Sequence, residues 1–309
     1  MKALIIGFGS IGKRHYDILC GLIGSGNVGV VSRRETGLDK SYGSLAEVTD
    51  INEYGYFVIA SKTCEHFEDL CHINNSVEDK IILCEKPLFE RSRSMVSLKN
   101  HVYVGYNLRF HPVVMKCREL LGIYGKVLFV RSYVGQYLPS WRPGTDYRDS
   151  YSAKKEEGGG IMMDCSHDID IIRFLFGRIV SFNAYNDKIS DLEITSDDYF
   201  SMIGRTEGGV LFSLNMDYIS KKAARVIEIN TEEATIVADI IGKTITLTTR
   251  SGETEIMHFP EIDRNTTYTA MHESIIEKKD NHCADYADGL DIASIFDNVR
   301  KNNLKQVWQ

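Results

Sequence analysis

The sequence predicts an α/β protein that begins with a doubly wound parallel sheet and continues into an α+β part with a large, mostly antiparallel open sheet. Two observations predict this. In the first 120 residues, short runs rich in Val and Ile alternate with stretches of helical length, and such runs are typical of strands buried on both faces. Beyond residue 120, most strand-like runs follow one another across short polar breaks, which leaves no room for crossover helices.

The individual elements follow from these patterns. In the first part we expect strands at 3–7, 28–32, 56–60, 81–85 and 102–106, and helices at 11–23, 64–74 and 91–100. In the second part we expect strands at 126–135, 179–187, 198–206, 209–218, 224–230, 234–240, 244–251 and 254–260, a helix over about 162–176 and a helical tail over 266–308. The predicted domains are therefore 1–120 and 121–309, with the C-terminal helix packing back on the first.

Composition narrows the class of protein. The chain of 309 residues has a formal net charge of −7 and no basic run, which argues against nucleic-acid binding. No apolar run reaches the roughly 18 residues of a membrane span, and glycines interrupt the N-terminal apolar run too early for a signal peptide. Seven cysteines without a C-x-x-C pair indicate reduced thiols. We expect a cytoplasmic protein without nucleic-acid or membrane partners.

A glycine pattern lies at the end of the first predicted strand. The segment "LIIGFGSIGKRH" places Gly7, Gly9 and Gly12 as G-x-G-x-x-G between a strand and a helix, with Ser10 and Ile11 at the start of that helix. The glycines permit a tight turn, a close approach of a pyrophosphate and close helix–strand packing. The helix N-terminus then offers N–H groups to the phosphates. This context predicts a dinucleotide site; the alternative is a glycine-rich turn in another α/β protein.

The end of the second predicted strand bears on which dinucleotide binds. An acidic residue about 20 positions past the last glycine would bind the ribose 2′-hydroxyl of NAD. Here that position is Ser32, followed by Arg33 and Arg34. A hydroxyl and two guanidiniums suit a 2′-phosphate. The sequence therefore favours NADP, with NAD as the alternative if the arginines are only solvated.

A lysine follows the fourth predicted strand in "IILCEKPLFE". Lys86 stands between Glu85 and Pro87 at the carboxyl end of a strand, where ligands bind in open parallel sheets. Pro87 permits a cis peptide bond, and Glu85 is placed to pair with the ammonium group. A nearby oxidised nicotinamide would favour the neutral amine, which suits proton exchange with a substrate hydroxyl. Lys86 is therefore a candidate catalytic residue.

The segment "GGGIMMDCSHDIDIIRFLFG" carries several titratable groups in an apolar stretch. Asp164 and His167 are three residues apart and would share one face of a helix that ends at Gly177. A histidine titrates near working pH and suits proton exchange. Two other interpretations are a buried structural histidine and a metal site of Asp164, His167 and Asp168. One helix face seldom suffices for a metal, so no metal is predicted.

Four segments together, "GFGSIG", "EKP", "GYNLRFHP" and the segment just described, resemble the glucose-fructose oxidoreductase / inositol dehydrogenase / MocA family. The resemblance extends over the whole chain. It implies a Rossmann domain followed by a domain with a large, mostly antiparallel sheet, and hydride transfer between a nicotinamide cofactor and a sugar or cyclitol.

The resemblance also implies roles for particular residues. The lysine of E-K-P, here Lys86, is catalytic in that family, and an Asp and a His in the later helix line the sugar site. His167 matches by its place before "DID", whereas "DCSH" is one residue shorter than the usual D-x-x-x-H. That departure puts the role of Asp164 in question. The family further supports Arg109 as a substrate residue, against a structural role at the domain junction, and His66 as a residue near the cofactor.

A polar and aromatic loop, "YLPSWRPGTDYRDSYSA", precedes the glycine triplet. An aromatic face for a sugar ring and guanidiniums for a phosphate or carboxylate are provided by Trp141, Arg142, Tyr147 and Arg148. We predict that this loop selects the substrate; an interdomain or subunit contact is the alternative.

Taken together, the sequence predicts an NAD(P)-dependent enzyme that acts on CH–OH groups. Its substrate would be a sugar secondary alcohol or ketone, a class that includes the nucleotide- and phospho-sugars of surface-polysaccharide synthesis. The alternatives are redox-neutral chemistry with tightly bound NAD and a cofactor-binding sensor without catalysis. An open sheet face also predicts a homodimer or homotetramer.

Overall fold

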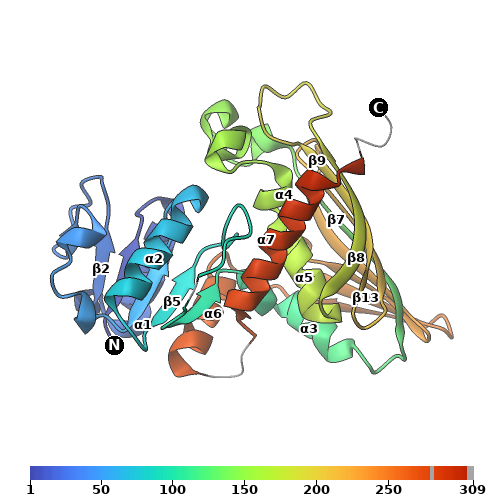
Figure 1. Ribbon diagram of the computed structural model, residues 1–309. Helices are drawn as coiled ribbons and strands as arrows, with labels where there is room; N and C mark the ends of the chain where they lie inside the picture. The colour runs from blue at the N-terminus through green and yellow to red at the C-terminus, as the bar shows by residue number, and fades with distance from the viewer. Residues whose placement is uncertain (96, 279–281, 305–309) are drawn as a thin grey trace. The chain divides into compact units, whose positions relative to one another are not determined.

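The chain builds two separate sheets, each within its own compact unit (Figure 1). The computed structural model describes residues 1–95, 97–278 and 282–304. The first unit consists of Met1–Asn107 and Arg264–Ser294, and the second of Leu108–Asp263 with the chain from Ile295 onward. The C-terminal segment Arg264–Ser294 thus belongs to the N-terminal unit. From the sequence we expected the division after residue 120.

The first sheet has seven strands in the order β15-β6-β5-β4-β1-β2-β3. Its strands are β1 (Ala3–Ile6), β2 (Val28–Val31), β3 (Ser41–Tyr42), β4 (Tyr56–Ile59), β5 (Ile81–Cys84), β6 (His101–Val104) and β15 (Ala284–Asp285). All pair in parallel except β15, which is antiparallel to β6. The order of β1 to β6 is that of a Rossmann fold. The predicted parallel sheet is confirmed, whereas β3 and β15 were not predicted.

Three helices accompany this sheet: α1 (Ser10–Ile23), α2 (His66–Ser76) and α6 (Thr266–Glu277). A set of short 3-10 turns connects the other elements, namely η1 (Ser25–Asn27), η2 (Leu45–Glu47), η3 (Ile51–Glu53) and η4 (Thr63–Glu65). The helix expected over 91–100 is wrong, since the described residues there are irregular. Side chains satisfy their backbone instead: the Asn74 amide donates to the carbonyl of Ser97 and accepts from the N–H of Lys99, both at 2.9 Å.

The second sheet has eight strands in the order β14-β13-β12-β11-β7-β10-β9-β8. They are β7 (Val127–Gly135), β8 (Ile179–Asp187), β9 (Tyr199–Thr206), β10 (Leu211–Asp217), β11 (Ala224–Thr231), β12 (Ala234–Asp239), β13 (Thr244–Thr249) and β14 (Thr254–His258). Only β7 and β10 pair in parallel. Buried and more exposed residues alternate along most of these strands, so one face forms a core. The predicted mostly antiparallel sheet is confirmed.

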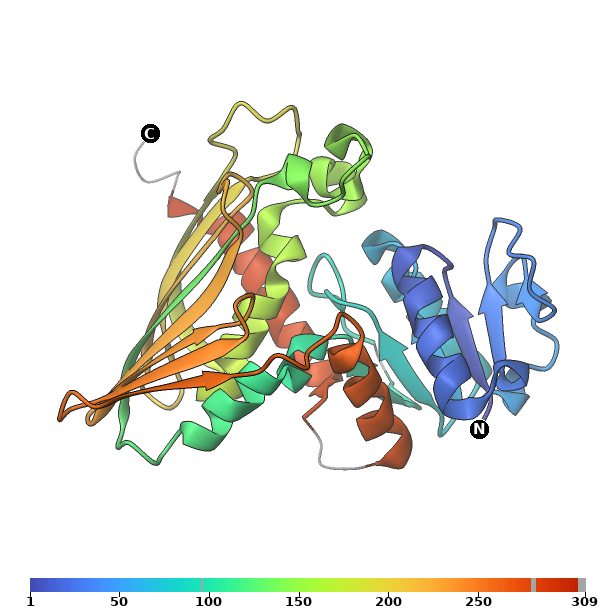
Figure 2. The same ribbon diagram turned by 180° about the vertical axis from the view of Figure 1, so that it is seen from behind.

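Helices α3 (Pro112–Leu120), α4 (Ile161–Asp164) and α5 (Ser166–Phe176) lie along one face of this sheet (Figures 1 and 2). The single helix predicted over about 162–176 is therefore wrong in one respect, because Cys165 leaves the helical conformation (φ −97°, ψ 23°) and separates α4 from α5. Gly177 ends α5 as predicted, with φ 90° and its N–H bonded to the carbonyl of Arg173.

The predicted helical tail is confirmed in part. Helices α6 and α7 (Tyr286–Lys301) are separated by β15, which was not predicted, and residues 279–281 and 305–308 of the predicted tail lie outside the described chain. In the parts that the structure describes, no helix is long and apolar enough to cross a membrane.

Candidate functional site

The glycine loop connects β1 to α1 and is shaped by three different constraints. Gly7 has φ 93°, and a Cβ there would lie 2.6 Å from the carbonyl oxygen of Ala60; a Cβ at Gly12 would lie 2.0 Å from the carbonyl oxygen of Gly7. At Gly9, by contrast, a Cβ would meet nothing within 4 Å. Two glycines are thus required for packing, and the third leaves open space at the N-terminus of α1. A pyrophosphate fits such a cradle. Ser10 and Ile11 form the first turn of that helix.

The residues after β2 are exposed and carry no acidic group at the position expected for NAD. The Ser32 hydroxyl donates to the carbonyl of Arg34 and accepts from its N–H, at 3.0 and 3.1 Å. The guanidinium of Arg33 donates to Glu65 at 2.8 Å. The Arg33 side chain is 77% exposed, so this ion pair is weak and readily exchanged.

Lys86 is the second residue after β5, at the carboxyl edge of the sheet, and its bond to Pro87 is cis. His66 at the start of α2 lies against the segment after the lysine. Its Nδ1 is 3.1 Å from the carbonyl oxygen of Pro87, and its Nε2 is 3.2 Å from that of Ser61. Burial lowers the pKa of His66 although these carbonyls oppose the effect. His66 therefore holds together the loops that follow β4 and β5.

Glu85 turns its carboxylate away from solvent. One oxygen, Oε2, accepts the N–H of Lys86 at 3.1 Å, and Oε1 is 2.9 Å from Nε2 of His15. Burial alone would raise the pKa of Glu85, but the hydrogen bond from His15 and the charge of Lys86 lower it below its usual value. A Cβ at Gly105 would lie 2.9 Å from the same Oε1. Glu85 is thus a buried carboxylate next to the candidate catalytic lysine.

The partner of Glu85 was not predicted from the sequence. His15 on α1 is buried and lies 2.8 Å from His272 on α6, which in turn lies 2.8 Å from the hydroxyl of Tyr56 on β4. His15 comes one helical turn after Gly12, and this position close to the glycine loop could have indicated it as a candidate site residue. No local pattern indicates His272, because it is 257 residues away in sequence.

The triple glycine before α4 is explained by crowding. A Cβ at Gly159 would lie 2.1 Å from the carbonyl oxygen of Tyr151, and one at Gly160 would lie 2.2 Å from a carboxylate oxygen of Asp197. Gly158 and Gly160 also have positive φ, 83° and 122°. The loop before α4 therefore packs directly on neighbouring backbone and on Asp197, which accepts the N–H of Met162 at 3.0 Å.

Asp164 ends α4 and is held by tyrosines. The Tyr218 hydroxyl donates to its Oδ2 at 2.6 Å. Burial, then the charge of Asp164, raises the pKa of Tyr218, while the charge of Asp164, then burial, raises that of Tyr151. Both phenols stay protonated, so they can donate to a carboxylate. Asp164 is therefore a positioned acceptor.

The other charged groups of this segment are mostly paired within the second unit. Asp168 is buried and lies 3.2 Å from the guanidinium of Arg225. Asp170 is buried and forms a bidentate pair with Arg109, at 2.8 and 2.6 Å. His167 is the second residue of α5 and is 9% exposed. The predicted site residue Arg109 thus contacts a carboxylate of the neighbouring helix, an arrangement with an evident structural use.

The predicted substrate loop follows β7 as a series of short 3-10 turns: η6 (Leu138–Ser140), η7 (Tyr147–Asp149), η8 (Tyr151–Ala153) and η9 (Lys155–Glu157). The Trp141 ring packs edge-on against Tyr218 with centroids 5.0 Å apart, and its Nε1 donates to the carbonyl of Gln136. Since Tyr218 binds Asp164, the loop and the end of α4 are connected through one tyrosine.

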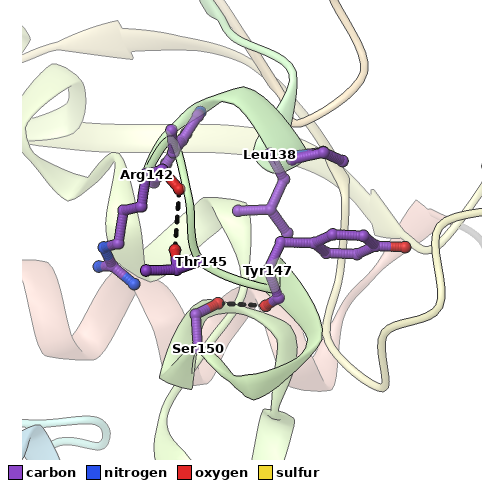
Figure 3. A pocket seen from close by; sticks show the side chains of 7 residues that line it. Leu138, Arg142, Thr145, Tyr147 and Ser150 are labelled. Carbon is purple, nitrogen blue, oxygen red and sulfur yellow. Dashed lines mark hydrogen bonds between the residues drawn. The ribbon is translucent and has the colours of Figure 1, made fainter.

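The loop encloses a small hollow that Figure 3 shows from close by. Its volume of about 10 Å³ has room for a single water and none for a sugar. The Arg142 and Tyr147 side chains extend to opposite sides of it (Figure 3), and the Arg142 guanidinium lies over the Tyr151 ring at 5.4 Å. Arg148 is bound by Asp146 at 2.6 Å and by Glu193 at 3.3 Å. The roles of these loop residues toward a substrate stay predictions.

No group of three or more His, Cys, Asp or Glu side chains suited to a metal ion occurs among residues 1–95, 97–278 and 282–304. The fold gives the class of the protein: the first unit has the Rossmann-like sheet that is typical of dinucleotide-binding proteins, with open space at Gly9, and the second unit has a large open sheet.

Comparison with known proteins supports the resemblance to a family. Residues 115–237 match the family model described as the GFO/IDH/MocA C-terminal domain. Over these residues the second unit is similar to the C-terminal domain of that family, which confirms the resemblance predicted from the sequence. No curated protein matches the sequence.

Solved structures share the whole architecture. Levoglucosan dehydrogenase, in complex with NADH and levoglucosan, is 18% identical with a TM-score of 0.84, over 99% of this chain and 97% of that one. UDP-N-acetylglucosamine 3-dehydrogenase from Acidithiobacillus ferrooxidans is 17% identical with a TM-score of 0.75, over 98% and 97%. A super-repressor mutant of Gal80p from Saccharomyces cerevisiae is 15% identical with a TM-score of 0.83, over 99% and 96%. At these identities the likeness establishes the fold alone.

Proposed function

We propose that this protein is an NAD(P)-dependent oxidoreductase that acts on a secondary alcohol, or the corresponding ketone, of a sugar or sugar derivative. The observation that carries the proposal is the open cradle at Gly9 together with Lys86 at the carboxyl edge of the same sheet. Ligands of open parallel sheets bind at that edge. The names of two solved structures with this fold, both sugar dehydrogenases, support the substrate class.

The chemistry divides between the cofactor and the protein. When bound, the nicotinamide accepts or gives a hydride. The chain then has to handle the proton of the substrate hydroxyl, which we assign to Lys86 with help from His167. Asp164, held by Tyr218, would orient the substrate or His167.

For the cofactor we propose a preference for NADP. Ser32 replaces the acidic residue that would repel a 2′-phosphate, and the Arg33 and Arg34 side chains are exposed beside it. The weak pair between Arg33 and Glu65 would exchange for the phosphate. A Ser32→Asp variant should bind NADP at least about tenfold more weakly and NAD as well as or better than before, because it adds a negative charge where the 2′-phosphate lies. Equal affinities of the unaltered protein for both cofactors would contradict the preference.

The decisive experiment is a screen of the purified protein with NAD or NADP against free sugars, sugar phosphates and nucleotide sugars, followed at 340 nm. Lys86→Ala should abolish turnover and leave the cofactor Kd within about twofold, since the lysine acts on the proton and not on the phosphates. Lys80→Ala is the matched control, because Lys80 directly precedes β5 and so lies at the opposite, amino end of the same strand. Joint loss of cofactor binding and turnover in Lys86→Ala would indicate a structural role instead.

One rival function has support from a specific observation. The Gal80p variant named above is called a super-repressor and has this fold, so the rival is a regulatory protein without catalysis, here a cofactor-binding sensor. A sensor would bind the dinucleotide and show no absorbance change with any sugar. Redox-neutral chemistry would instead convert substrate while the 340 nm absorbance returns to its starting value in every cycle. Product analysis by mass spectrometry separates these outcomes.

A further inference from the structure

Four buried groups form a continuous hydrogen-bonded chain inside the first unit. Glu85 Oε1 is 2.9 Å from His15 Nε2, His15 Nδ1 is 2.8 Å from His272 Nε2, and His272 Nδ1 is 2.8 Å from the Tyr56 hydroxyl. The other three residues of this hydrogen-bonded chain, His15, His272 and Tyr56, have no exposed surface. The chain runs from the carboxyl end of β5, through α1 and α6, to the first residue of β4.

Hydrogen-bond chemistry sets the direction of this chain. An ionised carboxylate only accepts, so His15 must donate from Nε2. A neutral His15 then has a lone pair on Nδ1, which requires a donor at Nε2 of His272. The Nδ1 of His272 is left as an acceptor, and the Tyr56 hydroxyl donates to it. Every link is satisfied with a single net charge, located on Glu85.

The hydrogen-bonded chain ends at Tyr56 in the core and therefore does not lead protons to solvent. Tyr56 is fully buried, and burial is the main cause that raises its pKa well above the usual value. Burial is the main cause that lowers the pKa of His272 well below its usual value. Neither group gives up or takes on a proton easily near neutral pH. The arrangement suits the holding of a charge rather than its transport.

We propose that His15 and His272 are positioning residues that hold Glu85 as a carboxylate beside Lys86, with both imidazoles neutral and protonated at Nε2. A fixed negative charge there stabilises the positive charge that Lys86 acquires on taking a proton. The proposal rests on the proposed role of Lys86. It also gives helix α6 an indirect part in the site, because α6 supplies His272, which acts on Glu85 through His15.

Other titratable groups also face this chain and belong in any account of its pH dependence. Around the carboxylate these are Lys86 and Tyr268, and Arg14 in turn lies over the Tyr268 ring at 5.1 Å. Around Tyr56 they are Tyr103 and Cys283.

The first test reads the tautomers directly and needs no activity. In protein labelled with ¹⁵N-histidine, two-bond correlation spectra at pH 7 should show His15 and His272 protonated at Nε2 and unprotonated at Nδ1. Loss of one signal set in His15→Gln and of the other in His272→Gln assigns them. An imidazolium at His15, or a proton on Nδ1 of His272, would overturn the proposal.

The second test uses pH profiles of kcat with the sugar substrate. His15→Leu and Glu85→Gln should both lower kcat by about tenfold or more and move the acidic limb to lower pH, with KM within about twofold. His15→Gln, which keeps an N–H donor, should restore most of the wild-type profile. His111→Ala is the matched control: His111 is a buried histidine that caps α3 by accepting the N–H of Val113, so its loss should leave the profile in place.

The outcomes separate this proposal from the proposed function. A His15→Leu profile with the wild-type acidic limb would overturn the positioning role while leaving the oxidoreductase intact. If the unaltered protein converts no sugar with either cofactor, the proposed function fails, and the tautomer spectra alone decide whether the chain holds a charge as described.

Discussion

Replacement of Arg109 by Met separates two roles that the sequence left open for this residue. Arg109 and Asp170 form a bidentate pair at 2.6 and 2.8 Å, with side-chain exposures of 6% and 1%. Methionine keeps most of the packing of the stem but leaves the Asp170 carboxylate buried without its guanidinium. The variant also loses a cation–π contact, because the Arg109 guanidinium lies 5.0 Å from the centroid of the Phe174 ring.

The expected magnitude follows from the burial. Two unit charges about 4 Å apart attract by about 4 kcal/mol at an effective dielectric constant of 20, and the breaking of a buried pair typically costs about 3–5 kcal/mol. The cation–π contact adds about 0.5–1 kcal/mol. We therefore expect Arg109→Met to lower the free energy of unfolding by about 3–5 kcal/mol. The double variant Arg109→Met/Asp170→Leu should recover most of this loss, because it removes both charges.

Urea unfolding followed by tryptophan fluorescence and circular dichroism measures these differences, and the substrate KM is measured on the same samples. A loss below about 1 kcal/mol combined with a large rise in KM would refute the structural assignment and favour substrate binding by Arg109. A double variant no more stable than the single one would show that the pair is not the origin of the effect.

Three further predictions follow from the geometry. Gly7→Ala should lower the free energy of unfolding by about 2 kcal/mol or more, since its Cβ would clash with backbone at a φ of 93°. Gly9→Ala meets nothing within 4 Å, so it should keep the wild-type Tm and weaken cofactor binding at least about tenfold by calorimetry. Equal losses of Tm in the two variants would contradict this. Burial raises the pKa of Asp197 from 3.8 to about 6, so its contribution to stability is full below pH 3.8 and is lost as pH rises through 6. In thermal unfolding, Asp197→Asn should therefore stabilise the protein by about 1–2 kcal/mol at pH 8 and change its stability little at pH 4. A larger stabilisation at pH 4 than at pH 8 would contradict this pH dependence. Ile203 is 62% exposed on the sheet face without helices, and Ile203→Lys should shift a homo-oligomer toward monomer in sedimentation velocity; an unchanged mass would place the contact elsewhere.

The strands and the glycine loop could be predicted because their signals are local. Val- and Ile-rich runs such as Ala3–Ile6 and Ile81–Cys84 are buried at every position, and each predicted strand lies at the predicted place. The conformation of Gly7 and the end of α5 at Gly177 likewise follow from single residues. Local chemistry was sufficient there.

The features that the sequence did not predict have a common physical cause: contacts between residues far apart in sequence determine the local structure there. The segment 91–100 has a helical length, but Asn74 binds its backbone from a different helix. The break at Cys165 lies next to Arg225, whose guanidinium contacts the Cys165 sulfur at 3.9 Å and Asp168 at 3.2 Å. His272 reaches its partner across 257 residues. No spacing rule within one segment indicates such pairs.

The return of the chain to its first sheet has a consequence for biosynthesis. Strand β15 pairs with β6, and α6 provides His272, yet Arg264–Ser294 leaves the ribosome only after the whole large sheet has been made. During translation the first unit therefore lacks one edge strand of its sheet and one histidine of its hydrogen-bonded chain, while the second sheet already has all eight strands. Completion of the first unit is thereby tied to prior synthesis of the whole second sheet.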